Sequence, residues 1–305
     1  MKQNVNEDDE VKIIGGGNLT YEEMMRKKHK DSFSKQKGLL MALFVLLCAL
    51  ICVSFYFLLG KGRQGYECKY ETSRTTEMVL KDLKQYKPDG TPSVSMLKDS
   101  VNGVVFKLYT LKNLTMQIVM GAYPDEEDST LYFVSRAMDY RKYSETMIGE
   151  FVIDGENMGE GRQRLAYLAS LPGGLPQVGI GRDDEVTDFV EKHRGNMIRQ
   201  FALVAAGQIC TDQFELKGKV TRAAYAWKES EPTVLYFLET LTNETLYDFS
   251  EAIVDYGFTD AIYITDGVWP HRFYRNEKGV VCDTTAAENK KNPRQYLIFK
   301  TTSSR

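Results

Sequence analysis

Asp266 is the strongest candidate for a reactive side chain in this sequence. It follows the apolar run Asp260–Thr265, which has the character of a buried strand, and it precedes Gly267. A carboxylate at the end of a buried strand is partly removed from water, and this shifts its pKa. The neighbouring glycine lets a ligand come close to the backbone. We therefore expect Asp266 to act as a general acid or base, or to hold a reacting group. The alternative is an Asp-Gly turn whose side chain is solvated.

Two further candidates follow Asp266 within six residues, at His271 and Arg272. An arginine can bind a phosphate through two parallel hydrogen bonds, and a histidine can donate a proton near neutral pH. These side chains can share a pocket with Asp266. The alternative is a surface strand that follows a turn at Pro270, in which neither side chain contacts a ligand.

Other candidates lie earlier in the chain. Arg222 begins a strand of small residues, where it is either a site residue or one partner of a buried ion pair. Asp154 and Asn157 belong to a loop rich in glycine and acidic residues, and we consider both as ligand contacts. Their spacing does not fit the twelve-residue calcium loop.

Several chemistries are excluded by the absence of their motifs. The chain has no G-x-S-x-G elbow, no H-E-x-x-H, no pair of CxxC motifs, and no dinucleotide fingerprint between a strand and a helix. It has only three histidines, and His29 lies in the polar N-terminal segment. We therefore predict no metal site and no cofactor. The net charge of −3 also gives no support to a nucleic-acid partner.

The pattern of apolar residues predicts an α+β fold, in which a mixed β-sheet domain carries packed helices. Leu246, Phe249, Ile253 and Tyr256 recur at helical spacing. Helices are predicted over Thr75–Tyr86, Arg162–Ser170, Glu185–His193 and Thr245–Tyr256. Strands are predicted over Gly103–Thr110 and Leu114–Gly121, paired as a hairpin, and over Leu131–Ala137, Met147–Ile153, Pro176–Gly181, Ile198–Ala206, Lys219–Trp227, Thr233–Thr240, Asp260–Thr265, His271–Arg275 and Gln295–Lys300.

A single transmembrane helix is predicted to precede this domain. Leu39–Leu59 contains no charged residue and no proline, and about 20 apolar residues span a bilayer. Six Lys and Arg residues lie before it and four lie after it, which favours an N-terminus in the cytoplasm. We expect a cytoplasmic tail (1–37), a membrane helix (38–60), a linker with a short helix (61–99), and an extracytoplasmic body that is periplasmic or at the cell surface. The alternative is a cleaved signal peptide.

The stretch Arg222–Gly267 resembles a known family. It runs from an arginine through a strand of small residues, an apolar strand, a helix that starts with Thr-Leu, and a strand that ends in Asp-Gly. These segments are Arg222–Ala224, Val234–Leu238, Thr245–Phe249 and Asp260–Gly267. Their order and spacing are similar to the C-terminal half of the phosphodiester glycosidase domain family. The resemblance implies such a domain over residues 100–305, hydrolysis of a sugar-1-phosphodiester, and a place in the site for Arg222, Asp266 and Gly267.

The chain also departs from this family. The family usually continues its Asp-Gly with more glycines, whereas here Val268-Trp269-Pro270-His271-Arg272 follows. Proline has no amide N–H with which to bind an anion. Asn157 is the nearest counterpart of the family's Asn-Gly-x-Phe segment. A changed substrate and a loss of catalysis would both fit these departures.

Two functions follow as hypotheses. In the first, a membrane-anchored hydrolase cleaves a glycan or sugar phosphodiester, and a second carboxyl group from Asp154 or Glu239 assists Asp266. The phosphate then pairs with Arg222 and Arg272.

In the second hypothesis, the same scaffold binds glycan or cell envelope without catalysis. Trp269 and Tyr274 then provide surfaces on which sugars stack. The partners in both cases are a glycan or sugar phosphate and, through Leu39–Leu59, a membrane.

Overall fold

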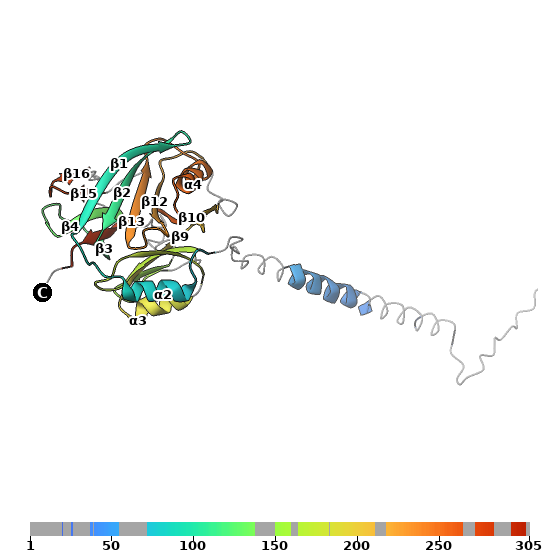
Figure 1. The fold of residues 1–305 in the computed structure, drawn as a ribbon. Coiled ribbons are helices and arrows are strands. Elements are labelled where there is room, and N and C mark those ends of the chain that lie inside the picture. Colours follow the sequence, from blue (N-terminus) through green and yellow to red (C-terminus); the bar gives the residue numbers. More distant parts are fainter. Residues whose placement is uncertain are drawn as a thin grey trace, which may run out of the picture. The chain divides into compact units, whose positions relative to one another are not determined.

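The computed structural model describes residues 20, 26, 37–38, 40–54, 72–137, 150–159, 164–182, 184–210, 218–264, 272–283 and 294–302 (Figure 1). The chain divides into two compact units, Met1–Gly65 and Tyr66–Arg305.

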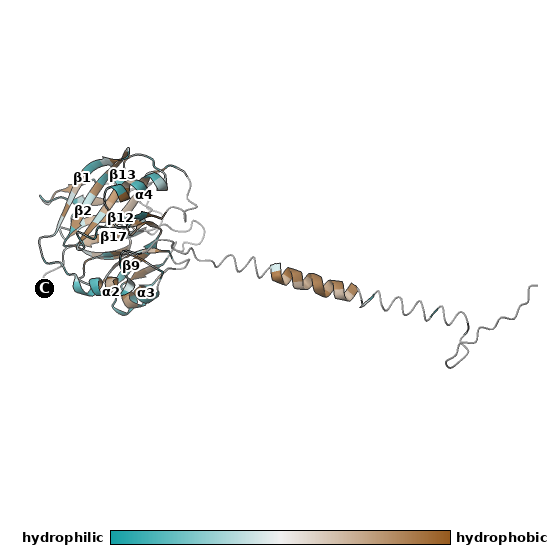
Figure 2. Ribbon diagram, turned by 45° about the vertical axis from the view of Figure 1, so that its right-hand side comes forward, coloured by the Kyte–Doolittle hydropathy of each residue, from teal (hydrophilic) through white to brown (hydrophobic). Residues whose placement is uncertain are grey.

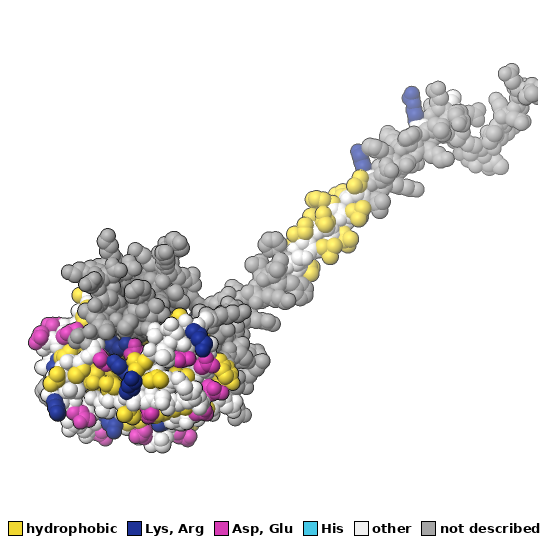
Figure 3. All heavy atoms as spheres, turned by 90° about the horizontal axis from the view of Figure 1, so that it is seen from above, with side chains coloured by type: hydrophobic (Ala, Val, Ile, Leu, Met, Phe, Trp, Pro, Cys, Tyr) yellow, Lys and Arg dark blue, Asp and Glu magenta, His cyan; other side chains and the backbone are white. Residues whose placement is uncertain are grey.

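In the first unit, residues 40–54 are helical, and their large apolar side chains are exposed (Figures 2 and 3). Within the described residues, no helix reaches the length and apolar character that a membrane crossing requires. Residues 39 and 55–59 of the predicted span Leu39–Leu59 lie outside the described residues. The membrane helix therefore stays a prediction.

The second unit is built around an antiparallel sheet of seven strands, in the order β1-β2-β13-β12-β14-β10-β11. We call it the central sheet. Its strands are β1 (Ser93–Val101), β2 (Val104–Lys112), β10 (Ala202–Ala205), β11 (Gln208–Ile209), β12 (Ala223–Trp227), β13 (Val234–Thr240) and β14 (Asp260–Ile264).

Two five-stranded antiparallel sheets complete the unit. The second sheet has the order β16-β15-β4-β17-β3, and the third has the order β6-β5-β9-β7-β8. The second contains β3 (Thr115–Gly121), β4 (Leu131–Arg136), β15 (Phe273–Arg275), β16 (Val281–Cys282) and β17 (Arg294–Lys300). The third contains β5 (Phe151–Ile153), β6 (Glu156–Asn157), β7 (Ala166–Ser170), β8 (Gln177–Ile180) and β9 (Asn196–Gln200).

Within the described part of this unit, three helices cover the outer faces of the central and third sheets (Figure 1). Helix α4 (Leu246–Asp255) packs on the central sheet, while α2 (Thr76–Gln85) and α3 (Asp184–Lys192) contact the third sheet. The Thr245 side chain accepts a hydrogen bond from the amide of Asp248, so it caps α4. Gly257 ends the helix with a φ of +90°, which a residue with a Cβ rarely adopts.

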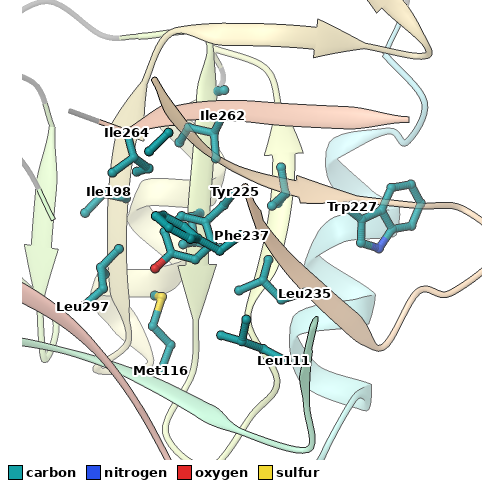
Figure 4. Packing of buried hydrophobic residues seen from close by; sticks show 14 of the residues in the cluster. Leu111, Met116, Ile198, Tyr225, Trp227, Leu235, Phe237, Ile262, Ile264 and Leu297 are labelled. Atoms are coloured by element: carbon teal, nitrogen blue, oxygen red, sulfur yellow. The ribbon is translucent and has the colours of Figure 1, made fainter. Parts of the chain in front are cut away.

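The largest core lies where the inner faces of all three sheets meet (Figure 4). Tyr225, Phe237 and Ile262 come from the central sheet, Leu297 from the second, and Ile198 from the third. A separate core fills the space between the outer face of the central sheet and α4. Successive residues of a strand therefore enter different cores.

The α+β class is confirmed, as are the helices predicted near α2, α3 and α4. The helix predicted over Arg162–Ser170 is wrong, because Ala166–Ser170 is the fully buried strand β7, paired on both sides with β8 and β9. Pairing on both edges outweighs the helix propensity of its alanine and leucine residues.

The predicted hairpin between Gly103–Thr110 and Leu114–Gly121 is also wrong. Strand β2 pairs with β1 through a turn at Asn102-Gly103, whose φ values are +51° and +82°. Asn-Gly is the residue pair that a two-residue hairpin turn favours. After Asn113 the chain leaves the central sheet, and β3 pairs with β17 in the second sheet.

Candidate functional site

The site is built at one end of the central sheet. Lys107 on β2, Glu239 on β13, Ala223 on β12 and Ile264 on β14 lie opposite one another across four neighbouring strands. Residues that pair in this way point to the same face of a sheet. Ala223 and Ile264 belong to the large core between the sheets, so Lys107 and Glu239 are on the inner face as well. This end of the inner face is where ionisable groups gather.

Glu239 and Arg272 form a buried ion pair on this face. Their side chains are 8% and 4% exposed, and Nη2 of Arg272 donates to Oε1 of Glu239. Arg272 also lies over the ring of Phe237, 5.9 Å from its centre. Burial raises the pKa of Glu239, and the charge and hydrogen bond of Arg272 lower it without cancelling the effect of burial. Glu239 thus holds its proton more strongly than a carboxyl group in water does.

Asp283, at the end of β16, joins the same group of residues. Its Oδ2 atom accepts hydrogen bonds from Nζ of Lys107 at 2.6 Å and from the hydroxyl of Tyr109 at 2.8 Å. Burial alone raises the pKa of Asp283. The hydrogen bonds from Lys107 and Tyr109, with the positive charges of Lys107 and Arg272, outweigh it and leave this pKa lower than usual.

We call these five residues the sheet-end cluster: Lys107, Tyr109, Glu239, Arg272 and Asp283. The cluster contains two carboxyl groups whose pKa values move in opposite directions, Glu239 upward and Asp283 downward. Such a pair can keep one carboxyl group protonated while the other is ionised, the arrangement that general acid–base chemistry needs. The two cations can bind an anionic group.

Arg222 lies on the opposite face of the same sheet end. Its Nε donates to the carbonyl of Glu244 at 3.0 Å, its Nη2 donates to the carbonyl of Gly218 at 2.8 Å, and its Nη1 lies 3.4 Å from the hydroxyl of Tyr263. The guanidinium therefore ties the start of β12 to two neighbouring loops. The structure does not bring Arg222 together with Glu239, and its predicted contact with substrate stays untested.

Asp154 and Asn157 belong to the third sheet. Asp154 and Gly155 form the turn between β5 and β6, with φ values of +49° and +88°. Asp154 accepts a hydrogen bond from Asn196, and Asn157 donates to Glu191 of α3. These contacts give both residues a structural role, fixing the turn beside α3.

Four predicted site residues lie outside the described residues: Asp266, Gly267, Trp269 and His271. Tyr274, predicted as a sugar-stacking surface, is buried against Tyr109, with the ring centres 5.3 Å apart. In the described part of the chain, no group of three or more His, Cys, Asp or Glu side chains is placed to hold a metal ion.

Lys107, Tyr109 and Asp283 were not predicted as site residues from the sequence. The sequence does contain a signal for Lys107 and Tyr109. Positions 104, 106 and 108 enter the core under α4, so positions 107, 109 and 111 face the inner side of the sheet. A lysine in such an inward-facing series is unusual. The sequence around Asp283 carries no comparable pattern.

No protein-family model matches the chain, and no curated protein matches it in sequence. Among solved structures, the chain is similar to the catalytic domain of zebrafish N-acetylglucosamine-1-phosphodiester alpha-N-acetylglucosaminidase, auto-inhibited by its pro-peptide. The TM-score is 0.52 at 10% identity, over 71% of this chain and 86% of that one. A hypothetical protein from Synechocystis gives a TM-score of 0.45 at 10% identity, over 70% of this chain and 64% of that one. The body of this chain thus has a fold like that of a phosphodiester glycosidase catalytic domain.

Proposed function

We propose that this protein is a membrane-anchored, extracytoplasmic hydrolase that cleaves a sugar-1-phosphodiester or a related glycan phosphodiester. The observation that carries the proposal is the fold likeness over 71% of the chain to a catalytic domain named for that reaction. The charged groups at the end of the central sheet support it, because the reaction needs carboxyl groups for proton transfer and cations for the phosphate.

In the proposed reaction, water attacks the anomeric carbon and the bond from that carbon to the phosphate oxygen breaks. The products are a free sugar and a phosphomonoester on the other partner. A basic carboxylate takes a proton from the water, while a protonated carboxyl group donates one to the departing oxygen.

We assign the second carboxyl group to Glu239 and keep Asp266 as the first. Glu239 lies in register with Ile264, and Asp266 follows Ile264 by two residues in the sequence. Asp154, the other candidate, lies on the third sheet and is engaged by Asn196. The raised pKa of Glu239 suits a proton donor.

The membrane anchor is the segment Leu39–Leu59, with the N-terminus in the cytoplasm. The excess of Lys and Arg before the segment supports this orientation. The body then lies on the side of the membrane where glycans of the envelope or cell surface are found. Protease treatment of sealed vesicles whose outer surface is the extracytoplasmic face checks the orientation. The protease should cleave the body of the protein and leave the cytoplasmic tail intact.

The activity is tested with the full-length protein in detergent, using a diester of N-acetylglucosamine 1-phosphate. We expect release of free sugar, and a loss of at least 100-fold in kcat for Glu239→Gln and for Asp266→Asn. Asp154→Asn is the matched control, since it removes a carboxylate from the third sheet, and it should retain turnover. Absence of turnover of any sugar-1-phosphodiester by the folded protein would refute the proposal.

A further inference from the structure

The strongest unassigned feature is the way in which Asp283 is held. Two donors, Nζ of Lys107 and the hydroxyl of Tyr109, converge on a single carboxylate oxygen at 2.6 and 2.8 Å. Both donors come from β2, two residues apart, and so lie on one face of an inner strand of the central sheet. Pairing with β1 and β13 fixes the backbone from which both side chains project, and this pairing does not involve Asp283.

The acceptor, by contrast, comes from a weakly held segment. Asp283 directly follows the two-residue strand β16, which lies at the edge of the second sheet. Its φ is +54°, in the left-handed region that residues other than glycine adopt at a cost. The side chains of Asp283 and Lys107 are 29% and 23% exposed, whereas Tyr109 is fully buried. Strand β2 and the Tyr109 hydroxyl are therefore the fixed part of this contact, and the carboxylate is the part that can be exchanged.

The charges of the sheet-end cluster are consistent with replacement of the Asp283 carboxylate by an anionic ligand. Lys107 and Arg272 each carry a positive charge, and Asp283 carries a negative charge beside them. When the Asp283 carboxylate moves away, the cluster loses one negative charge, whether Glu239 is protonated or ionised. A phosphodiester carries one negative charge and presents oxygen acceptors, as a carboxylate does. The hydroxyl of Tyr109 remains a donor, because burial raises its pKa far above neutrality.

We propose that Lys107, Tyr109 and Arg272 form a binding site for a phosphodiester monoanion, and that the carboxylate of Asp283 occupies this site in the structure as an internal substitute. Ligand binding displaces the carboxylate and preserves the charge balance of the cluster. The inference rests on the proposed function for the identity of the anion, and its test measures binding without turnover.

The test is calorimetric titration of the full-length protein in detergent with diethyl phosphate, at constant ionic strength. Asp283→Asn keeps the size of the side chain but removes the competing charge, and we expect it to lower the Kd at least tenfold. Adding Lys107→Met to this variant should raise the Kd at least tenfold. Lys112→Met, on the exposed end of the same strand, is the matched control and should leave the Kd unchanged.

Asp283→Gly is the second variant, because glycine accepts the positive φ and also removes the carboxylate. It should bind diethyl phosphate as tightly as Asp283→Asn does. The proposal is overturned if both variants bind no more tightly than the wild type, or if Lys107→Met and Lys112→Met have equal effects. Inorganic phosphate and sulfate are titrated in parallel. Weaker binding of both than of diethyl phosphate is expected, and equal affinity for sulfate would refute a specific phosphate site.

The two proposals fail in different ways. Turnover of a sugar-1-phosphodiester with no effect of Asp283→Asn on binding would refute the internal substitute and leave the proposed function standing. Binding of diethyl phosphate as expected, without turnover of any diester, would refute the hydrolase and leave the anion site standing.

Discussion

The buried ion pair between Arg272 and Glu239 allows a quantitative test of the sheet-end cluster. Arg272→Met removes the guanidinium, which lies over the ring of Phe237, and leaves an unbranched apolar side chain in its place. Glu239, whose side chain is only 8% exposed, then loses the partner that stabilises its negative charge. Removing one member of a buried pair costs about 3–5 kcal/mol, because the other charge stays buried without compensation.

For a folding unit of this size, each kcal/mol lowers the Tm by about 2–4 °C, so the expected decrease is roughly 6–20 °C. The effect depends on pH, with a sign that follows from the pKa of Glu239. Burial already raises this pKa, and loss of Arg272 removes the largest influence that lowers it. The folded state then binds the proton more tightly than the unfolded state, so the free energy of unfolding decreases as pH rises from the unfolded to the folded pKa.

The destabilisation should therefore be smallest below the unfolded pKa of Glu239, about 4.3, where the carboxyl group is protonated in both states. It should grow as the pH rises through the folded pKa. Thermal unfolding followed by circular dichroism at a series of pH values measures it. Glu239→Met combined with Arg272→Met removes both charges, and this double variant should be more stable at neutral pH than Arg272→Met alone. Two results would refute the buried pair. One is a destabilisation by Arg272→Met that is the same at all pH values. The other is a double variant whose loss of stability equals the sum of the losses from Arg272→Met and Glu239→Met alone.

Two further predictions concern the frame around the site. Thr245→Ala should lower the free energy of unfolding by about 1 kcal/mol, because it removes the cap of α4. Thr233→Ala, at an exposed position, is the control and should leave the free energy of unfolding unchanged. Equal urea midpoints for the two variants would contradict the cap. Arg222→Met removes a donor from the carbonyl of Gly218 and leaves the carbonyl of Glu244 with the amide of Val220 alone. It should cost about 1–3 kcal/mol, with no change in the Kd for diethyl phosphate. A weaker Kd with an unchanged Tm would instead place Arg222 in the ligand site.

Much of the fold could be predicted from the sequence where local pattern and tertiary pairing agree. The segment Thr245–Tyr256 combines helical spacing, a threonine cap and a closing glycine, and it forms α4 nearly as predicted. The apolar runs that form β13 and β14 are also confirmed. The errors arose where non-local pairing decides the outcome. The single strand predicted over Ile198–Ala206 is divided between β9 in the third sheet and β10 in the central sheet. Ala166–Ser170 is a strand because β8 and β9 border it, which no local pattern reveals.

The site was harder to predict because its parts are distant in the sequence. Lys107 and Asp283 are separated by 176 positions, and Glu239 and Arg272 by 33. Only the packing of the second sheet against the central sheet brings Asp283 to Tyr109, and a single sequence contains no signal for this contact. Asp266, the residue from which the sequence analysis began, lies outside the described residues and stays a prediction.

The alternation of side chains along a strand carries more functional information than the identity of a single arginine. Arg222 and Ala223 are adjacent, yet they face opposite sides of the central sheet, and only the side of Ala223 is shared with Glu239 and Lys107. Because side chains alternate with a period of two, a charge in the inward-facing series of a buried strand must be either paired or functional. Lys107 meets this condition through Asp283, its partner in the structure. In the proposed anion site that partner is exchangeable, and the lysine lies on the core face to bind the ligand that replaces it.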